Sequence, residues 1–196
     1  MKRVFCIIPL LAVFVMSMFS APVFASQFDD DTEYHAAVDW MFAKGLTKYQ
    51  DYNEFRPGDI LTREEASKFF TEFSMNILLQ VIDMAKYCEF DDLEEADPTL
   101  RNSILQSCLL NLFYGSAGKF FPHRQLTKAQ ALTVLMRALE GNQPEDIEPW
   151  WYYYHARALE IGLTSEQNVN DLDKPVTRYE MALLLYRAAV EVADGE

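Results

Sequence analysis

The chain contains few of the residues that bind transition metals, with three histidines and three cysteines among 196 residues. His35, His123 and His155 lie far apart in the sequence, whereas zinc sites usually draw their ligands from closely spaced pairs. The acidic runs at 29–31 and 91–95 lack the glycine and the terminal glutamate of a calcium-binding EF-hand loop. We therefore expect no metal site and interpret both acidic runs as solvated charge.

Basic residues are also scarce, because 17 lysines and arginines accompany 30 aspartates and glutamates and leave a net charge of −13. Binding to nucleic acid or to anionic lipid requires clustered positive charge. The composition therefore argues against a nucleic-acid partner. A ligand that is itself anionic has to be held by local geometry against the field of the whole molecule.

Recognisable catalytic motifs are missing as well. The sequence has no nucleophile elbow, no phosphate-binding loop and no cysteine at a telling distance from a histidine. Carboxylates are abundant, but no spacing selects two of them for acid–base chemistry. We predict that the protein is not an enzyme and that it carries no cofactor.

Long apolar runs are absent beyond the first residues of the chain. Lys2 and Arg3 precede an apolar run over 4–19, and Val23-Phe24-Ala25 offers small residues to signal peptidase. This pattern predicts a signal peptide over 1–25 and a secreted protein with no membrane span after cleavage. An uncleaved membrane anchor is the alternative, although the run is shorter than the ~20 residues that a spanning helix needs.

Two cysteines, Cys88 and Cys108, follow the predicted cleavage site. Secreted proteins form disulfides in their oxidising surroundings, and we expect these two cysteines to pair. In the chain-entropy model, closing a loop of about twenty residues contributes ~3 kcal/mol of stability. The alternative is two buried thiols that act as small apolar side chains.

One motif occurs three times, at 61–65, 126–130 and 176–180. It consists of an apolar residue, a threonine, a basic residue, a spacer and a glutamate or glutamine. Such a motif starts a helix, because the threonine hydroxyl accepts from the N–H of the third helical residue, whose side chain reaches back to the threonine N–H. The threonines Thr62, Thr127 and Thr177 lie 65 and then 50 residues apart. Three copies in the same order indicate an internally repeated unit.

A shorter helix, a turn and a loop precede each motif. Gly45, Asn111 and Gly162 follow helical apolar patterns and suit the left-handed conformation that ends a helix. The first two loops carry Phe55-Arg56-Pro57 and Phe120-Phe121-Pro122, each with an aromatic residue seven positions before the threonine. We expect this aromatic residue to plug the gap between the two helices of a unit. Asn170 takes its place in the third unit.

The helices that follow the motifs carry the larger apolar faces. For the first of them we predict an amphipathic stripe that runs from Ala66 through Ile77 and Val81 to Ala85, toward Lys86. Three such helices can bury their faces only against one another. The predicted fold is all-α and forms one compact domain. It has three helix–loop–helix units, over 26–87, 88–141 and 142–196, in a pseudo-threefold arrangement around a three-helix core.

These residues resemble the S-layer homology (SLH) repeats of bacterial cell-surface proteins. The likeness covers nearly the whole chain after residue 25. It rests on Phe28-Asp29-Asp30, Phe90-Asp91-Asp92, Gly45-Leu46, Gly162-Leu163, Phe55-Arg56-Pro57 and above all Thr62-Arg63-Glu64-Glu65. Members of that family commonly carry three repeats in a pseudo-trimer and bind envelope polysaccharide non-covalently in grooves between repeats.

The resemblance implies that Arg63 and Arg178 meet the acidic sugar of an anionic cell-wall polysaccharide, either a secondary cell-wall polymer or a peptidoglycan-linked one. Lys128 departs from the pattern, as does Gln130, and a lysine lacks the planar two-pronged donor of arginine. In this hypothesis, free helix N–H groups beside each cation complete an anion pocket. The alternative is that each cation pairs with a nearby carboxylate at the surface.

Two further sets of residues are candidates for ligand contact. The threonines are helix caps first and ligand contacts second; they are Thr62, Thr127 and Thr177. Trp40, Trp150 and Trp151 are candidates for stacking on sugar rings, with packing against the core as the alternative.

The sequence thus predicts a secreted, non-catalytic protein of the bacterial cell envelope that binds glycan between its repeats. Other surface-layer proteins are further candidate partners. The alternative function is that of a protein–protein adaptor or self-assembling surface-layer component without glycan binding.

Overall fold

The computed structural model describes residues 30–143 and 148–194, so the predicted signal peptide over 1–25 lies outside the described residues. Within those ranges the chain is helical and has no named strand, which confirms the all-α prediction. None of the helices there is long and apolar enough to cross a membrane. The α-helices are α1 (Asp30–Ala43), α2 (Tyr52–Phe55), α3 (Arg63–Asn76), α4 (Arg101–Leu109), α5 (Lys128–Glu140), α6 (Tyr152–Glu160) and α7 (Arg178–Asp194), with 3₁₀ turns η1 (Leu93–Glu95) and η2 (Val169–Asp171).

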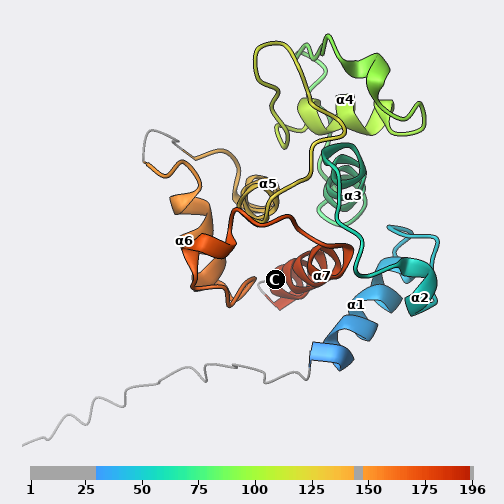
Figure 1. Cartoon of the computed structure of the whole chain (residues 1–196), viewed down its shortest axis with the longest axis vertical. Helices are drawn as coiled ribbons and strands as arrows, with labels where there is room; N and C mark the ends of the chain where they lie inside the picture. Colours follow the sequence, from blue (N-terminus) through green and yellow to red (C-terminus); the bar gives the residue numbers. More distant parts are fainter. Residues whose placement is uncertain (1–29, 144–147, 195–196) are drawn as a thin grey trace, which may run out of the picture.

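Helices α3, α5 and α7 form the centre of the molecule and are seen nearly end-on in Figure 1. Helix α5 packs against both α3 and α7. It is buried around most of its circumference, because neighbouring helices cover several of its sides. Its buried apolar residues are Ala129, Ala131, Leu132, Val134, Leu135, Met136 and Ala138.

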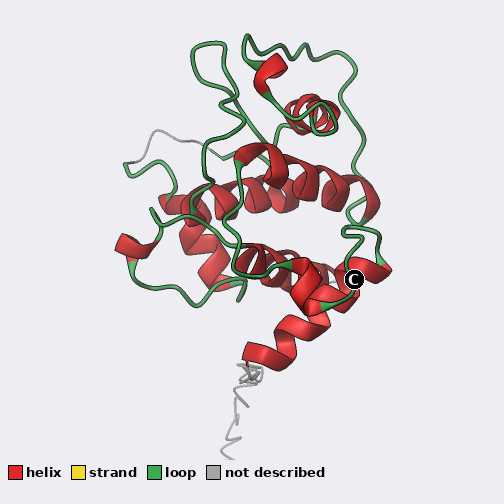
Figure 2. Ribbon diagram, turned by 45° about the vertical axis from the view of Figure 1, so that its right-hand side comes forward, coloured by secondary structure: helices red, strands yellow, loops and turns green. Residues whose placement is uncertain are grey.

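The remaining long helices cover this centre from outside (Figure 2). Helix α4 packs on α3, and α6 packs on α5, so each outer helix lies on the central helix that precedes it in the chain. Helix α1 has no central helix before it and packs on α7, the last one. The outer helices therefore pair with the central helices in a closed order, α3 with α4, α5 with α6, and α7 with α1.

All three predicted capping boxes are present. The Glu65 backbone N–H donates to Thr62 Oγ1 at 3.4 Å, and Glu65 Oε2 accepts from the Thr62 backbone N–H at 2.9 Å. The same reciprocal bonds join Thr127 with Gln130 and Thr177 with Glu180. Local side-chain chemistry thus sets where each central helix begins.

The apolar residues that precede the three threonines form a closed ring of backbone hydrogen bonds. The Leu61 N–H donates to Val176 O at 3.1 Å, the Val176 N–H to Leu126 O at 2.8 Å, and the Leu126 N–H to Leu61 O at 3.0 Å. All three side chains are fully buried. The ring places the starts of α3, α5 and α7 side by side, although they are far apart in the sequence.

The predicted helix ends are confirmed at three positions. Gly45, Asn111 and Gly162 have φ angles of 71°, 61° and 74°, in the left-handed region. An apolar residue follows each of them and is buried; these are Leu46, Leu112 and Leu163. The turn after each outer helix therefore inserts a leucine into the core.

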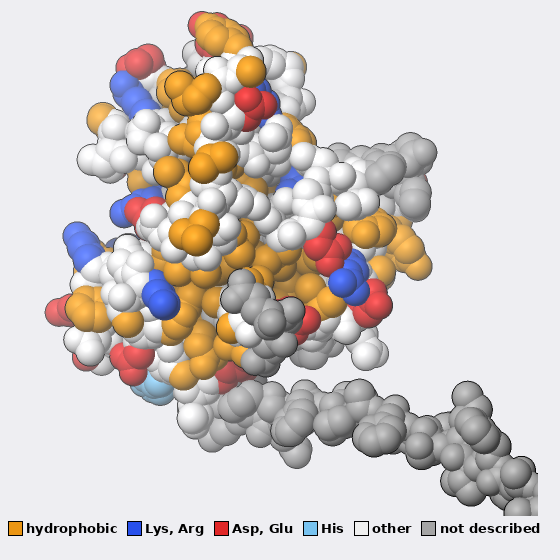
Figure 3. All heavy atoms as spheres, turned by 180° about the vertical axis from the view of Figure 1, so that it is seen from behind, with side chains coloured by type: hydrophobic (Ala, Val, Ile, Leu, Met, Phe, Trp, Pro, Cys, Tyr) orange, Lys and Arg blue, Asp and Glu red, His pale blue; other side chains and the backbone are white. Residues whose placement is uncertain are grey.

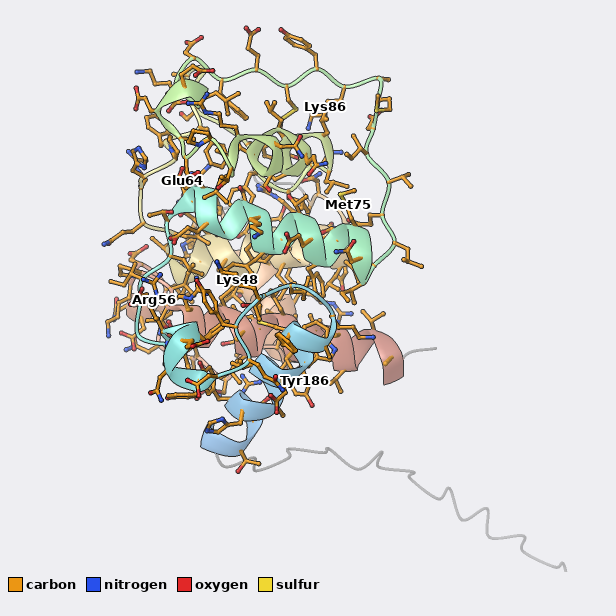
Figure 4. All side chains as sticks on the ribbon, turned by 90° about the vertical axis from the view of Figure 1, so that its right-hand side faces the viewer. Lys48, Arg56, Glu64, Met75, Lys86 and Tyr186 are labelled. Carbon is orange, nitrogen blue, oxygen red and sulfur yellow. A yellow bond between two sulfur atoms is a disulfide. The ribbon has the colours of Figure 1, made fainter. Side chains whose placement is uncertain are left out.

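The predicted long stripe on α3 is wrong, because the helix ends at Asn76. Leu79 has a φ of 55°, and the N–H groups of its neighbours Leu78 and Gln80 turn back to Phe73 O and Ser74 O. The chain then arcs outward from Met75 and returns above α4 to Lys86 (Figure 4). Val81, which the predicted stripe would bury, is 87% exposed.

The expected disulfide is present and fastens this returning segment to α4. Cys88 and Cys108 are bonded, with their Cα atoms 6.2 Å apart. Beside them Lys86 Nζ donates to Cys108 O at 2.7 Å and to Asn111 Oδ1 at 2.6 Å. The Lys86 ammonium thus adds a donor at the C-terminal end of α4 and in the turn that follows it.

Candidate functional site

The backbone N–H groups at the starts of the central helices are already bonded. The Lys128 N–H donates to Lys174 O and the Ala129 N–H to Leu172 O, both at 2.9 Å. The first two N–H groups of α3 donate to Arg124 O and Pro122 O, and those of α7 to Asp59 O and Pro57 O. The expectation that free helix N–H groups complete an anion pocket is therefore wrong.

Arg63, at the start of α3, is held by the loop between α4 and α5. Its Nε donates to Phe120 O at 2.9 Å and its Nη2 to Tyr114 O at 3.1 Å. Its guanidinium lies over two rings, 4.9 Å from the centroid of Phe120 and 5.3 Å from that of Phe113. Burial lowers the pKa of Arg63 to about 10, because the charged form loses hydration.

Arg178, at the start of α7, repeats this arrangement with the loop after α1. Its Nε donates to Phe55 O at 2.7 Å, and its guanidinium lies 4.7 Å from the centroid of the Phe55 ring and 5.4 Å from that of Phe69. The residue is only 7% exposed, and burial lowers its pKa. At both junctions an arginine and two aromatic rings fill the space between neighbouring helix starts.

Lys128, at the start of α5, has different surroundings. Its Nζ lies 2.6 Å from Glu180 Oε1, and the two side chains are 24% and 29% exposed. The alternative reading, in which the motif cation pairs with a carboxylate, thus describes Lys128. Glu180 uses its other oxygen, Oε2, to accept from the Thr177 N–H in the capping box of α7.

A pocket of about 240 Å³ opens beside this ion pair, between α5, α7 and the loop after α6. Its apolar lining is Leu132, Leu163, Leu172, Val176, Leu183 and Leu184, and its polar lining is Lys128, Thr164, Ser165, Glu166, Glu180 and Arg187. The pocket therefore joins an aliphatic wall to a rim that carries both signs of charge.

The third unit lacks aromatic residues at two positions that carry rings in the second unit. Asn170 precedes Thr177 by seven residues, as Phe120 precedes Thr127. Thr164 follows the buried leucine of its turn, as Phe113 does in the preceding unit. Two small polar residues thus replace the two rings that lie under Arg63. Among the residues that the structure describes, no aromatic ring lies over the Lys128 ammonium, which pairs with Glu180.

Hydrogen bonds and an ion pair hold several residues of the pocket wall. Arg187 Nε and Nη2 lie 2.7 Å and 2.6 Å from the two carboxylate oxygens of Glu33 on α1. His155 Nε2 lies 2.7 Å from Glu166 O, which can only accept, so this nitrogen carries the proton. Glu166 Oε1 accepts from the Asn168 N–H at 2.9 Å. The polar rim is therefore largely preorganised.

The predicted aromatic candidates do not line this pocket. Trp40 is half-buried on α1, with ring centroids 6.4 Å from Phe73 and 5.9 Å from Tyr186. Trp151 is half-buried and meets His155 edge-on, while Trp150 is 37% exposed. Core packing accounts for Trp40 and Trp151.

Sequence reasoning missed Glu180, Thr164 and Arg187 as residues of a site. The signal that could have found the site was the departure of the third unit from the other two, namely Asn170 in the place of phenylalanine. Within the described ranges no group of three or more histidine, cysteine, aspartate or glutamate side chains is arranged to hold a metal ion.

Comparison with known proteins gives a limited result. No family model matches the chain. A "Cell surface protein" from Thermoanaerobacter kivui is 26% identical over 208 residues, an alignment that covers 100% of this chain and 26% of the relative. The chain thus spans about a quarter of the length of the curated relative that it matches, and its similarity is to one part of a larger surface protein.

Proposed function

We propose that the protein is a non-catalytic component of the bacterial cell surface that binds envelope glycan at a cleft between SLH-like repeats. The repeat arrangement that we propose is pseudo-threefold. It is supported by the closed ring of hydrogen bonds among Leu61, Val176 and Leu126 and by three capping boxes of the same design.

The observation that carries the proposal is the open pocket beside Lys128 and Glu180. Sugar-binding sites need an apolar surface for the C–H face of the ring and polar groups around it for the hydroxyls. The leucine wall offers the first, and the side chains of Thr164, Ser165 and Glu166 offer the second. Lys128 is the cation that meets an acidic substituent.

A surface location has independent support. The matched relative is named a cell surface protein. The disulfide between Cys88 and Cys108 suits a protein that folds outside the reducing cytosol. The signal peptide predicted over 1–25 agrees with both.

Sedimentation with purified cell-wall sacculi tests the proposal. We expect the mature protein to sediment with intact sacculi and to remain in solution when the accessory polymer has been stripped from them. Lys128→Ala should weaken sedimentation, while Lys68→Ala, which removes a lysine from the outer face of α3, should not. Equal sedimentation with intact and stripped sacculi would contradict binding to the polymer.

The alternative, a protein–protein adaptor, is favoured by a different observation. In the segment that connects α3 to α4, four large apolar side chains are exposed to solvent: Leu79, Val81, Met84 and Tyr87. Apolar side chains also gather over the middle of the face shown in Figure 3. If the protein is an adaptor, Leu79→Ser with Val81→Ser should abolish capture of a protein partner and leave sedimentation with sacculi unchanged.

A further inference from the structure

We infer that Glu180 is a built-in competitor for the ligand, because its carboxylate occupies Lys128 until an anionic group on the glycan displaces it. This inference rests on the proposed function and assigns the acidic part of the ligand to the pocket between α5 and α7. The geometric basis is the 2.6 Å contact between Lys128 Nζ and Glu180 Oε1 at the rim of that pocket.

The other two motif cations are occupied differently. Arg63 and Arg178 each donate from Nε to a loop carbonyl and lie over two aromatic rings. A ligand that took over these donors would have to break the hydrogen bonds to the loop carbonyls and the ring contacts. At Lys128 the resident partner is one carboxylate oxygen of Glu180, and both side chains of the pair are partly exposed, at 24% and 29%. Exchange of one carboxylate for another therefore costs least at this junction.

The two carboxylate oxygens of Glu180 have different partners, one in the helix cap and one in the ion pair. Oε2 accepts from the Thr177 N–H at 2.9 Å and caps α7, while Oε1 contacts Lys128. A glutamine keeps the first role, because Gln130 Oε1 accepts from the Thr127 N–H in the same position of α5. Glu180→Gln therefore removes the competing charge and retains the cap.

Charge beyond the pair acts in the same direction. The chain carries a net charge of −13, so an incoming anion meets an adverse field. Glu166 also lies on the pocket, and Glu180, once displaced, would remain close to the bound anion. Removing the Glu180 charge should thus strengthen binding of an anionic ligand in two ways. It frees the Lys128 ammonium, and it lessens the repulsion between the protein and the bound anion.

A titration with glucuronate, as a small carboxylated sugar, and with glucose, as its neutral counterpart, tests the inference on the whole mature protein. We expect Glu180→Gln to lower the Kd for glucuronate by about two- to fivefold, the range of one partly exposed charge contact, and to leave glucose binding no tighter. Glu65→Gln is the matched control, since it makes the same change in the capping box of α3 and should have no effect. Adding Lys128→Ala should abolish the gain from Glu180→Gln.

Closing the pocket provides a second variant. Thr164→Phe places an aromatic ring where Phe113 lies in the preceding unit, and it should abolish glucuronate binding while leaving the helical circular dichroism unchanged. The inference is overturned if Glu180→Gln and the wild type bind glucuronate equally, if neither binds it, or if Thr164→Phe still binds. Failure of the wild type to sediment with sacculi, with the glucuronate results as expected, would instead overturn the proposed function alone.

Discussion

Arg178 and Phe55 lie 123 residues apart in the sequence and are joined twice, by a 2.7 Å hydrogen bond from Nε to the backbone oxygen and by the guanidinium above the ring. The contact ties the start of the last central helix to the loop that follows the first outer helix. Arg63 and Phe120 make the same pair of contacts 57 residues apart. These arginines hold the folded chain together at two junctions.

Arg178→Ala should therefore lower the free energy of unfolding by about 2–4 kcal/mol, because it removes a charged hydrogen bond and leaves the buried Phe55 carbonyl without that donor. Arg178→Lys should recover little, since lysine lacks the planar donor that bonds and stacks at once. Denaturant unfolding at constant m-value measures both. Lys128→Ala, at the more exposed third junction, should cost no more than about 1 kcal/mol. Equal losses at the two junctions would contradict this account.

Each capping threonine should contribute separately to stability. Thr62→Ala, Thr127→Ala and Thr177→Ala should each cost about 0.5–2 kcal/mol, because each leaves an N–H at a helix start without its side-chain acceptor. The matched Thr→Ser variants keep the hydroxyl and should lose much less. Thermal unfolding followed by circular dichroism compares the pairs, and indistinguishable alanine and serine variants would contradict a capping role.

The disulfide should stabilise the segment between α3 and α4 more than the rest of the molecule. Its cysteines are 20 residues apart, and replacing both with serine should cost about 2–4 kcal/mol by the chain-entropy estimate. Hydrogen exchange should rise mainly over 77–108. Thiol labelling of the mature protein should detect two reactive cysteines only after reduction, and labelling before reduction would contradict the bond.

Glu72 should make stability depend on pH. Burial raises the pKa of Glu72, although Lys68 opposes the shift, and among the described residues its Oε2 is buried without a hydrogen-bond partner. The folded state therefore binds this proton more tightly than the unfolded state, and the contribution of this group to stability rises as the pH falls through the raised pKa. Glu72→Gln should be more stable than the wild type at pH 7, and the difference should shrink toward pH 4. Parallel pH profiles would contradict this prediction.

Helix starts and turns were predictable from the sequence because their chemistry is local. The capping boxes involve residues three apart, and Gly45, Asn111 and Gly162 end helices through their own backbone preferences. The end of α3 was not predictable in this way. Leu79 adopts a left-handed conformation that its residue type disfavours, and the apolar spacing continues past it without a break.

The candidate site was only partly predictable. The motif named the three cations but not their partners, because Phe120 and Phe55 approach Arg63 and Arg178 from loops distant in the sequence. Asn170 marked the third unit as different, yet only the packed structure shows a pocket at this junction. The missing aromatic side chain at position 170 could be related to a site only once the residues around it were placed.

Helix α1 rests on α7, so the element that begins the described fold also seals it. An open solenoid lengthens by stacking another unit on a bare end. Here α1, the first outer helix, already covers α7, the last central helix. A further helix pair could stack on α7 only if α1 were displaced from it. The contact between α1 and α7 therefore closes the order in which the described helices pair, whereas the last helix of an open solenoid stays exposed on one side.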